Sequence, residues 1–203
     1  MKPPTISPFL IAMASAALFS CQTKVESPIP EKIAKPSTKT SHEDSRELSK
    51  LKEASKKKPQ LVVFLRHFGC LFAKEAISQL AKLEPQIEER GVQLNLVHMS
   101  KPEAGKAFIE TYGIKNAKLI SDPKLKLYKE FGLKKASFDQ IVNECTIKRS
   151  KEASDKGHKI TSPAGDISQL AGVFLIKDGK LKKEFRHKDA GELPDYLELS
   201  TLD

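Results

Sequence analysis

The sequence predicts an α/β fold in which a central mixed β-sheet is flanked by helices. Two observations lead to this prediction. From about Pro59 onward, short apolar runs alternate with segments whose apolar residues recur three or four positions apart, which is the pattern of strands followed by covering helices. Near the C-terminus, two strand patterns flank Asp178-Gly179, a strong short signal for a β-hairpin.

The first half of this region is expected to contain three strands and two helices, the strands at 61–67, 92–98 and 118–121 and the helices at 71–89 and 102–112. Pro85 lies inside the first helical pattern and predicts a kink or a division near Leu83, because proline cannot donate a helical hydrogen bond. The second helix is expected to begin with Ser100 as its N-cap and Pro102 in its first turn.

The second half is expected to contain helices at 125–131, 136–147 and 193–202, a loop at 149–166, and hairpin strands at 171–177 and 180–187. In the helix at 136–147, an apolar face is formed by helical spacing of Phe138, Ile141, Val142 and Cys145. The order strand, helix, strand, helix, strand, helix, hairpin, helix is that of a thioredoxin-like fold.

Cys70 stands where the first strand pattern passes into the first helical pattern. The free N–H groups and the dipole at a helix N-terminus favour an anion, so a cysteine at this position is favoured in its thiolate form. The thiolate is the reactive form of cysteine, and Cys70 is therefore the first candidate for chemistry.

The N-terminal 20 residues have the pattern of a signal peptide. Lys2 precedes the apolar stretch 8–19, which is too short to span a bilayer but suits a secretory signal. The run Leu18-Phe19-Ser20-Cys21 resembles a bacterial lipobox, which implies a lipid anchor at Cys21; ordinary cleavage and an uncleaved anchor are the alternatives. An anchored protein would lie in the bacterial cell envelope, at the outer membrane or the periplasmic face of the inner membrane.

Residues 21–58 are rich in lysine, serine and proline and predict a flexible tether, in which 42–57 has the spacing of a transient or docked helix. The folded domain is expected at 59–203. The formal net charge is +9, but the lysines are spread along the chain without the aromatic residues of a base-stacking surface. We therefore expect no nucleic-acid partner; a basic surface near anionic lipid or a merely solvated surface accounts for the charge.

Several short runs together resemble the peroxiredoxin-like proteins of the alkyl hydroperoxide reductase and thiol-specific antioxidant superfamily, in the branch related to selenoprotein L. These runs are Phe64-Leu65-Arg66-His67-Phe68-Gly69-Cys70, Leu119-Ile120-Ser121-Asp122-Pro123, Leu127-Tyr128, Phe131-Gly132-Leu133, Gln169-Leu170-Ala171-Gly172-Val173-Phe174 and His187-Lys188-Asp189-Ala190-Gly191. The resemblance covers about Leu61 to the C-terminus. It implies a thioredoxin-like fold with a redox Cys-x-x-Cys pair at the first strand-to-helix junction.

The chain departs from that family pattern at two positions. Ala73 stands where the second cysteine of the pair is expected, so a disulfide within the motif is not available. His67 stands where the peroxiredoxin pattern places threonine or serine, three residues before the peroxidatic cysteine. The resemblance therefore does not extend to the threonine or serine that takes part in the family's standard activation of peroxide.

Two hypotheses follow for function. In the first, the chain is a membrane-anchored thiol redox protein and a one-cysteine peroxidase or antioxidant, which takes a peroxide or disulfide substrate at Cys70 and is reduced by an external thiol. Arg186 and Arg66 are the candidate positive groups, with a surface ion pair as the alternative for each, and His67 is a candidate partner of the thiol. In the second, the chain is a catalytically degenerate lipoprotein that keeps the fold as a binding or structural module.

Cys145 is the other cysteine outside the lipobox, so one intramolecular disulfide with Cys70 is available in an exported compartment. Cys145 is therefore a possible resolving residue, and its place on an apolar face gives the alternative of a small buried hydrophobe. The five histidines are scattered, and no phosphate-cradling glycine loop occurs. We expect no metal and no cofactor.

Overall fold

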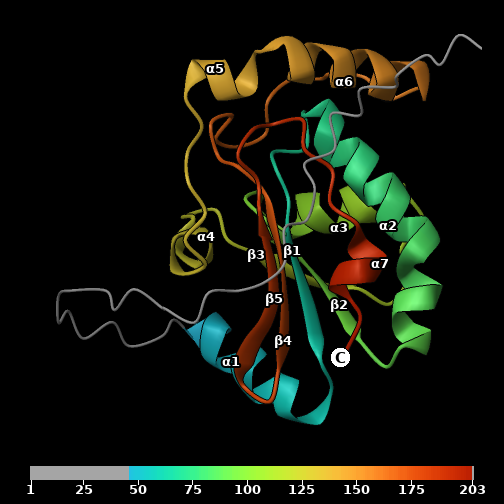
Figure 1. The fold of residues 1–203 in the computed structure, drawn as a ribbon, viewed down its shortest axis with the longest axis vertical. Coiled ribbons are helices and arrows are strands. Elements are labelled where there is room, and N and C mark those ends of the chain that lie inside the picture. The colour runs from blue at the N-terminus through green and yellow to red at the C-terminus, as the bar shows by residue number, and fades with distance from the viewer. Residues whose placement is uncertain (1–45, 203) are drawn as a thin grey trace, which may run out of the picture. The chain divides into compact units, whose positions relative to one another are not determined.

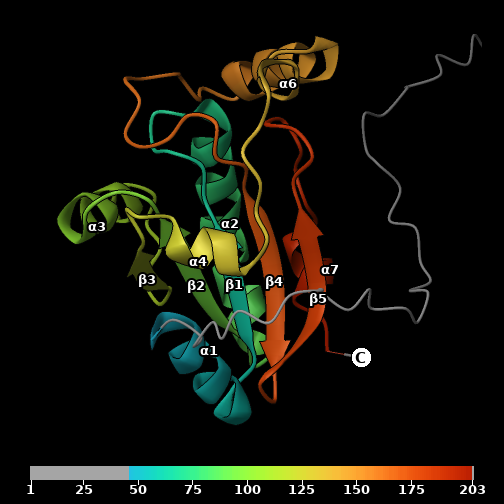
Figure 2. The same ribbon diagram turned by 90° about the vertical axis from the view of Figure 1, so that its left-hand side faces the viewer.

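The computed structural model describes residues 46–202, which form a five-stranded mixed sheet covered by helices on both faces (Figures 1 and 2). The strands are β1 (Gln60–Phe64), β2 (Gln93–His98), β3 (Lys118–Ser121), β4 (Gly172–Lys177) and β5 (Lys180–Arg186). Their order in the sheet is β3-β2-β1-β4-β5, with β1, β2 and β3 parallel and β4 and β5 antiparallel. The expected α/β architecture is confirmed. The signal peptide, Cys21 and the expected tether up to residue 45 lie outside the described residues.

The helices are α1 (Arg46–Lys57), α2 (Leu71–Glu89), α3 (Pro102–Glu110), α4 (Lys126–Glu130), α5 (Phe138–Ile141), α6 (Glu144–Asp155) and α7 (Tyr196–Leu199). Helices α1 and α4 cover one face of the sheet, and α2 and α7 cover the other (Figure 1). Figure 1 shows α5 and α6 beyond one end of the strands, above the start of α2.

Strand β1 is buried along its whole length at the centre of the sheet. Because successive side chains of a strand point to opposite faces, Val63 packs in the α2 core while Val62 and Phe64 pack in the α1/α4 core. The buried Tyr128 hydroxyl of α4 donates to the Leu65 carbonyl at 2.6 Å. This bond fixes the backbone that leaves β1 and leads to Cys70.

The hairpin prediction and the expected helix before the domain are both confirmed. Asp178 and Gly179 have positive φ angles of 54° and 73°, as a tight two-residue turn requires. Residues 46–57, expected as part of the tether with a transient or docked helix, form α1. This helix is docked, because Leu51 is buried in the core between α1, α4 and the sheet.

The prediction of one helix over 136–147 is wrong, and so is the start of the loop at 149. Asn143 adopts an extended conformation and caps a new helix, its side chain accepting a hydrogen bond from the Thr146 N–H at 2.8 Å. The chain therefore forms two helices, and α6 continues to Asp155. The expected buried apolar face is absent from this described segment, where Phe138 is 74% exposed and Val142 44% exposed.

Three smaller expectations also need correction. Helix α2 continues through Pro85 without division, because one missing hydrogen bond is tolerated in a 19-residue helix with a buried face. The N-cap of α3 is Lys101 rather than Ser100, although Pro102 begins the helix as expected. The closing helix is a single turn, because Asp195 caps it late and the chain leaves it after Leu199.

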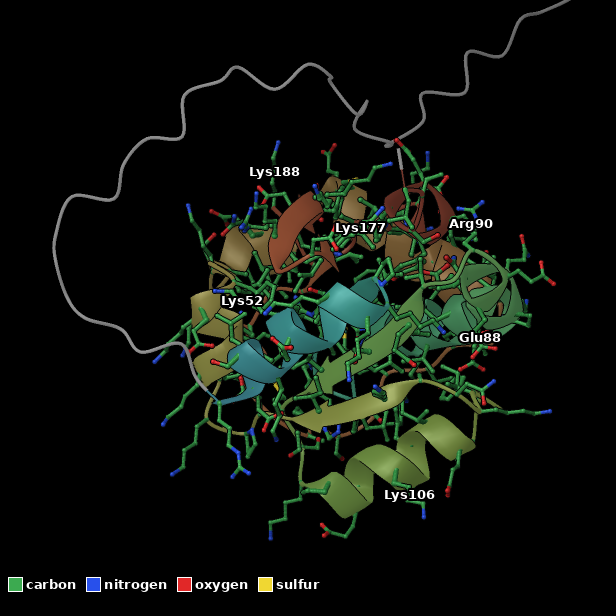
Figure 3. All side chains as sticks on the ribbon, turned by 90° about the horizontal axis from the view of Figure 1, so that it is seen from below. Lys52, Glu88, Arg90, Lys106, Lys177 and Lys188 are labelled. Atoms are coloured by element: carbon green, nitrogen blue, oxygen red, sulfur yellow. The ribbon has the colours of Figure 1, made fainter. Side chains whose placement is uncertain are left out.

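The basic side chains do not gather on one face in the view of Figure 3. Lys52, Lys106, Lys177 and Lys188 point outward from different parts of the domain. Lys106 also lies 3.8 Å from Glu110 on its own helix. The lysines of this view have the spread of a solvated surface rather than of a continuous basic groove.

Candidate functional site

Cys70 lies at the start of α2, as the sequence predicts. Its backbone is extended, with φ −76° and ψ 129°, and the first helical residue follows it. The Cys70 N–H donates to the His67 carbonyl at 2.9 Å, and the Cys70 carbonyl accepts from the Lys74 N–H at 3.2 Å. The side chain makes no capping hydrogen bond, carries a free thiol and is 8% exposed. The thiol residue is thus at the end of the helix where the first backbone N–H groups have no intrahelical hydrogen-bond acceptor.

Arg66 lies four residues before Cys70, in the loop between β1 and α2, and is 4% exposed. One guanidinium nitrogen, Nη2, donates to the Ile167 carbonyl at 2.7 Å. The other two, Nε and Nη1, are buried and have no hydrogen-bond partner within residues 46–202. A buried cation with unused donors is costly, so this loop has the capacity to bind an anion or a peroxide oxygen.

Two histidines lie beside Arg66, and each has a buried Nδ1 without a partner in the described part of the chain. Burial lowers the pKa of His67, and the Arg66 charge lowers it further. Burial and then the same charge lower the pKa of His187 to about 4. Both rings are therefore neutral at pH 7, which leaves Arg66 as the cation of this loop.

Ala73, at the place of the absent second cysteine, is 3% exposed. It lines a small cavity together with Phe72, Arg66 and His187. The cavity has a volume of ≈ 20 Å³, which is room for about one water molecule. The site therefore holds a thiol at the helix start, a buried cation in the preceding loop, and a small apolar space beside Ala73, where the related motif has its second cysteine.

The structure separates Arg186 from this arrangement. Its Nε donates to the Phe131 carbonyl at 2.9 Å, and its guanidinium carbon lies 5.0 Å from the Phe174 ring centre. It also forms an ion pair with Glu184. Phe131 and Phe174 belong to the core under α1 and α4, on the face of the sheet opposite α2. Of the two arginines named from the sequence, Arg66 alone is in the loop that carries Cys70.

Cys145 lies in the first turn of α6 and is partly exposed. Helix α6 is fastened to α2 by Glu75, whose side chain is 2% exposed and accepts from Arg149 and Lys156 at 2.7 Å each. This ion-pair cluster holds the Cys145 helix across the beginning of α2. A resolving role for Cys145 stays a prediction.

A segment that the sequence predicts only as a loop lies against the residue before Cys70. The Thr161 N–H donates to the Gly69 carbonyl at 3.0 Å, and Lys74 of α2 donates to the Lys159 carbonyl at 2.7 Å. Lys74 and this segment were not among the predicted site residues. In the sequence, only a composition rich in lysine, serine and glycine marks this stretch as a loop.

Within residues 46–202, no group of three or more histidine, cysteine or acidic side chains is arranged to hold a metal ion. In the same part of the chain, no helix combines the length and the apolar character that crossing a membrane requires.

A thioredoxin-like sheet with a thiol at its first strand-to-helix junction defines a thiol redox fold. The AhpC/TSA antioxidant enzyme family model matches residues 79–191, more than half of the chain. The chain belongs to this family, and it is a peroxiredoxin-like protein with a thioredoxin fold and, at the level of the family, a thiol redox function.

Two relatives illustrate the level of sequence similarity within this family. The chain is 26% identical to prostamide/prostaglandin F synthase of Salmo salar over 71% of this chain and 72% of the relative. It is 28% identical to peroxiredoxin-like 2C of Homo sapiens over 66% of this chain and 62% of the relative.

Solved structures share the fold at low sequence identity. PrxQ of Xylella fastidiosa superposes with a TM-score of 0.51 at 15% identity, covering 72% of this chain and 75% of that one. Reduced Prx3 of Vibrio vulnificus, solved in complex with H₂O₂, gives 0.50 at 14% identity, covering 70% and 76%.

The lowered pKa of His187 predicts a pH dependence of stability. His187 has a pKa of about 4 in the folded chain and about 6.5 in the unfolded chain, so below pH 6.5 the unfolded chain binds the proton more readily. Above about pH 6.5 neither state binds it, and the free energy of unfolding has its full value with respect to this group. This contribution is lost as the pH falls through the window from 6.5 to 4. Denaturant unfolding at pH 7.5, 5.5 and 4.5 should show this loss. The loss should be smaller in His187→Gln, where the lowered pKa values of His67, His98 and His158 still contribute to it. An equal slope in the variant would contradict the assignment. The pKa of Asp166 is lowered to about 2, so the stability that this group contributes is lost only below this window.

Proposed function

We propose that the chain is a one-cysteine thiol peroxidase that acts through Cys70 and is regenerated by an external thiol. The observation that carries the proposal is the pairing, in one loop, of a free thiol at the start of α2 with the buried guanidinium of Arg66 and its two unused donors. Membership of the AhpC/TSA family and the fold shared with peroxiredoxins support a peroxide substrate and a thiol reductant.

The proposed cycle needs one protein sulfur atom. The Cys70 thiolate attacks one peroxide oxygen, so that an S–O bond forms, the O–O bond breaks, and the other oxygen leaves with its substituent and takes up a proton as water or an alcohol. The product is a sulfenic acid. A thiol then attacks this sulfur, releasing water and forming a mixed disulfide, and a second thiol releases Cys70 in its reduced form.

Arg66 has a defined part in the first step. Its Nε and Nη1 hydrogens are free to hold a peroxide oxygen, and its permanent charge stabilises the negative charge that develops on the leaving oxygen. Its position is fixed before substrate binds, because Nη2 is held by the Ile167 carbonyl. Arg186 has no such part in this proposal, because its contacts lie on the other face of the sheet.

A specific observation favours a second candidate, a binding or structural module without turnover. Cys70 is 8% exposed, and Ala73 removes the partner thiol of the motif. Treatment of the full chain with micromolar hydrogen peroxide and a sulfenic-acid probe separates the two candidates. Probe attached to the Cys70 peptide supports the peroxidase. An unlabelled Cys70 peptide would contradict the peroxidase and favour the binding or structural module.

We also propose that the protein is exported and lipid-anchored through Cys21 in the bacterial cell envelope. The support is the sequence Leu18-Phe19-Ser20-Cys21 after a short apolar stretch. Palmitate fed to expressing bacteria is expected to label the wild-type chain and not Cys21→Ala. Cys145→Ala is the matched control and should stay labelled; label retained in Cys21→Ala would contradict the anchor.

A further inference from the structure

The segment His158–Ser168, named here the strap, lies directly against Gly69, the residue before Cys70. The Thr161 N–H donates to the Gly69 carbonyl at 3.0 Å. A Cβ atom added to Gly69 would lie 2.3 Å from the Ser162 carbonyl oxygen, so only glycine allows the two backbones to approach this closely. The strap therefore contributes to the low exposure of Cys70.

Side chains from several other parts of the fold fasten the strap by polar contacts. These contacts are Lys74 Nζ to the Lys159 carbonyl (2.7 Å) and to Thr161 Oγ1 (3.0 Å), Arg66 Nη2 to the Ile167 carbonyl (2.7 Å), Ser100 Oγ to the Ala164 carbonyl (3.3 Å) and Lys135 to Asp166 (2.8 Å). Residues 159–165 are all exposed and contribute no buried side chain. Apart from the close approach of its backbone to Gly69 and Met99, the strap is thus held by polar contacts, and each lost contact should loosen it.

Little open surface is left at the thiol itself, because Cys70 is 8% exposed. The cavity lined by Arg66, Ala73 and His187 does not include Cys70 in its lining and has a volume of ≈ 20 Å³, which is room for about one water molecule. It therefore offers no space for a branched alkyl or aryl group. A bulky substituent on a peroxide would have to displace the strap from the start of α2.

We propose that the strap restricts Cys70 to small peroxides, with hydrogen peroxide as the substrate, and that Lys74 is a specificity-determining residue because it makes two of the strap contacts. This inference rests on the proposed peroxidase function. In the oxidation step the substituent on the leaving oxygen must stay within the site while the O–O bond breaks. With hydrogen peroxide the leaving group becomes water and needs no further space.

The test measures the rate at which Cys70 in the full chain is oxidised by hydrogen peroxide and by cumene hydroperoxide, with dithiothreitol as the reductant. The wild type is expected to prefer hydrogen peroxide by at least about tenfold. Lys74→Met should reduce this preference about threefold or more by accelerating the bulky substrate. Lys82→Met, an exposed lysine two turns further along α2, is the matched control and should keep it. Equal rates for the two peroxides in the wild type would overturn the proposal.

A second readout does not depend on peroxide chemistry. Methyl methanethiosulfonate and an aromatic disulfide both modify a cysteine thiol but differ in size, and modification of the Cys70 peptide is followed by mass spectrometry. The aromatic reagent should react slowly with the wild type and several-fold faster with Lys74→Met or with Ser100→Ala, which removes a separate strap contact. If this size effect is found but neither peroxide oxidises Cys70, the peroxidase function fails and the substrate assignment with it, while the steric barrier stands. If both reagents react equally with wild type and variants, the strap is no barrier.

Discussion

Replacement of Cys70 by serine is expected to abolish peroxide reduction, with a loss of at least about a thousandfold in the rate of peroxide consumption with dithiothreitol as the reductant. A serine hydroxyl stays protonated near pH 7 and cannot accept the peroxide oxygen as a thiolate does. The side chain makes no capping hydrogen bond and differs little in size, so the fold should be unchanged. Peroxide consumption by the purified full chain provides the measurement.

Cys145→Ser is the matched control for that experiment. In the one-cysteine cycle Cys145 has no role, so the variant should keep the wild-type rate with dithiothreitol as the reductant. A drop to the Cys70→Ser level would contradict the one-cysteine cycle and assign a resolving role to Cys145. A Cys70 to Cys145 disulfide, found by mass spectrometry after peroxide treatment, would support the same conclusion.

The second large effect is expected at Arg66. Arg66→Met should slow the oxidation of Cys70 by about a hundredfold, which corresponds to about 2.7 kcal/mol of lost transition-state stabilisation. The variant should fold at least as stably as the wild type, because methionine removes a buried cation that has a single hydrogen bond in the described structure. Single-turnover oxidation and denaturant unfolding measure the two effects.

Arg186→Met is the control for the effect of Arg66→Met on the oxidation rate. It removes the same charge from the chain, but from contacts with Phe131 and Phe174 on the opposite face of the sheet. The oxidation rate should therefore stay within about twofold of wild type. Equal losses in the two variants would mean that general positive charge, and not the Arg66 position, supports the reaction.

The features that the sequence predicts correctly are those encoded by neighbouring residues. The apolar run into Cys70 and the helical spacing after it place the thiol at a helix start, and Asp178-Gly179 specifies its turn through backbone conformation alone. The error at 136–147 has the same local origin. The spacing of apolar residues there imitates one amphipathic helix, while the capping side chain of Asn143 starts a second.

The features that could not be predicted depend on contacts between distant residues. Lys74 and Arg66 bind the strap through the backbone carbonyls of Lys159 and Ile167, and a carbonyl acceptor is present in every residue. No sequence pattern therefore marks these contacts. Arg186 is a candidate from the sequence, but the direction of its side chain depends on its contacts with Phe131 and Phe174, which the sequence does not reveal.

The central claim is that the fold makes Cys70 reactive toward peroxide, and it is tested most directly by comparing the rate of Cys70 oxidation in the folded and the unfolded chain. Hydrogen peroxide is added to the reduced full chain in native buffer and in denaturant, and sulfenic acid on the Cys70 peptide is followed over time by probe labelling and mass spectrometry. We expect oxidation in the folded chain to be at least about a hundredfold faster, because the helix start and Arg66 act only when the chain is folded. Oxidation that is slower in the folded chain would show that the fold merely buries Cys70 and would contradict the peroxidase function.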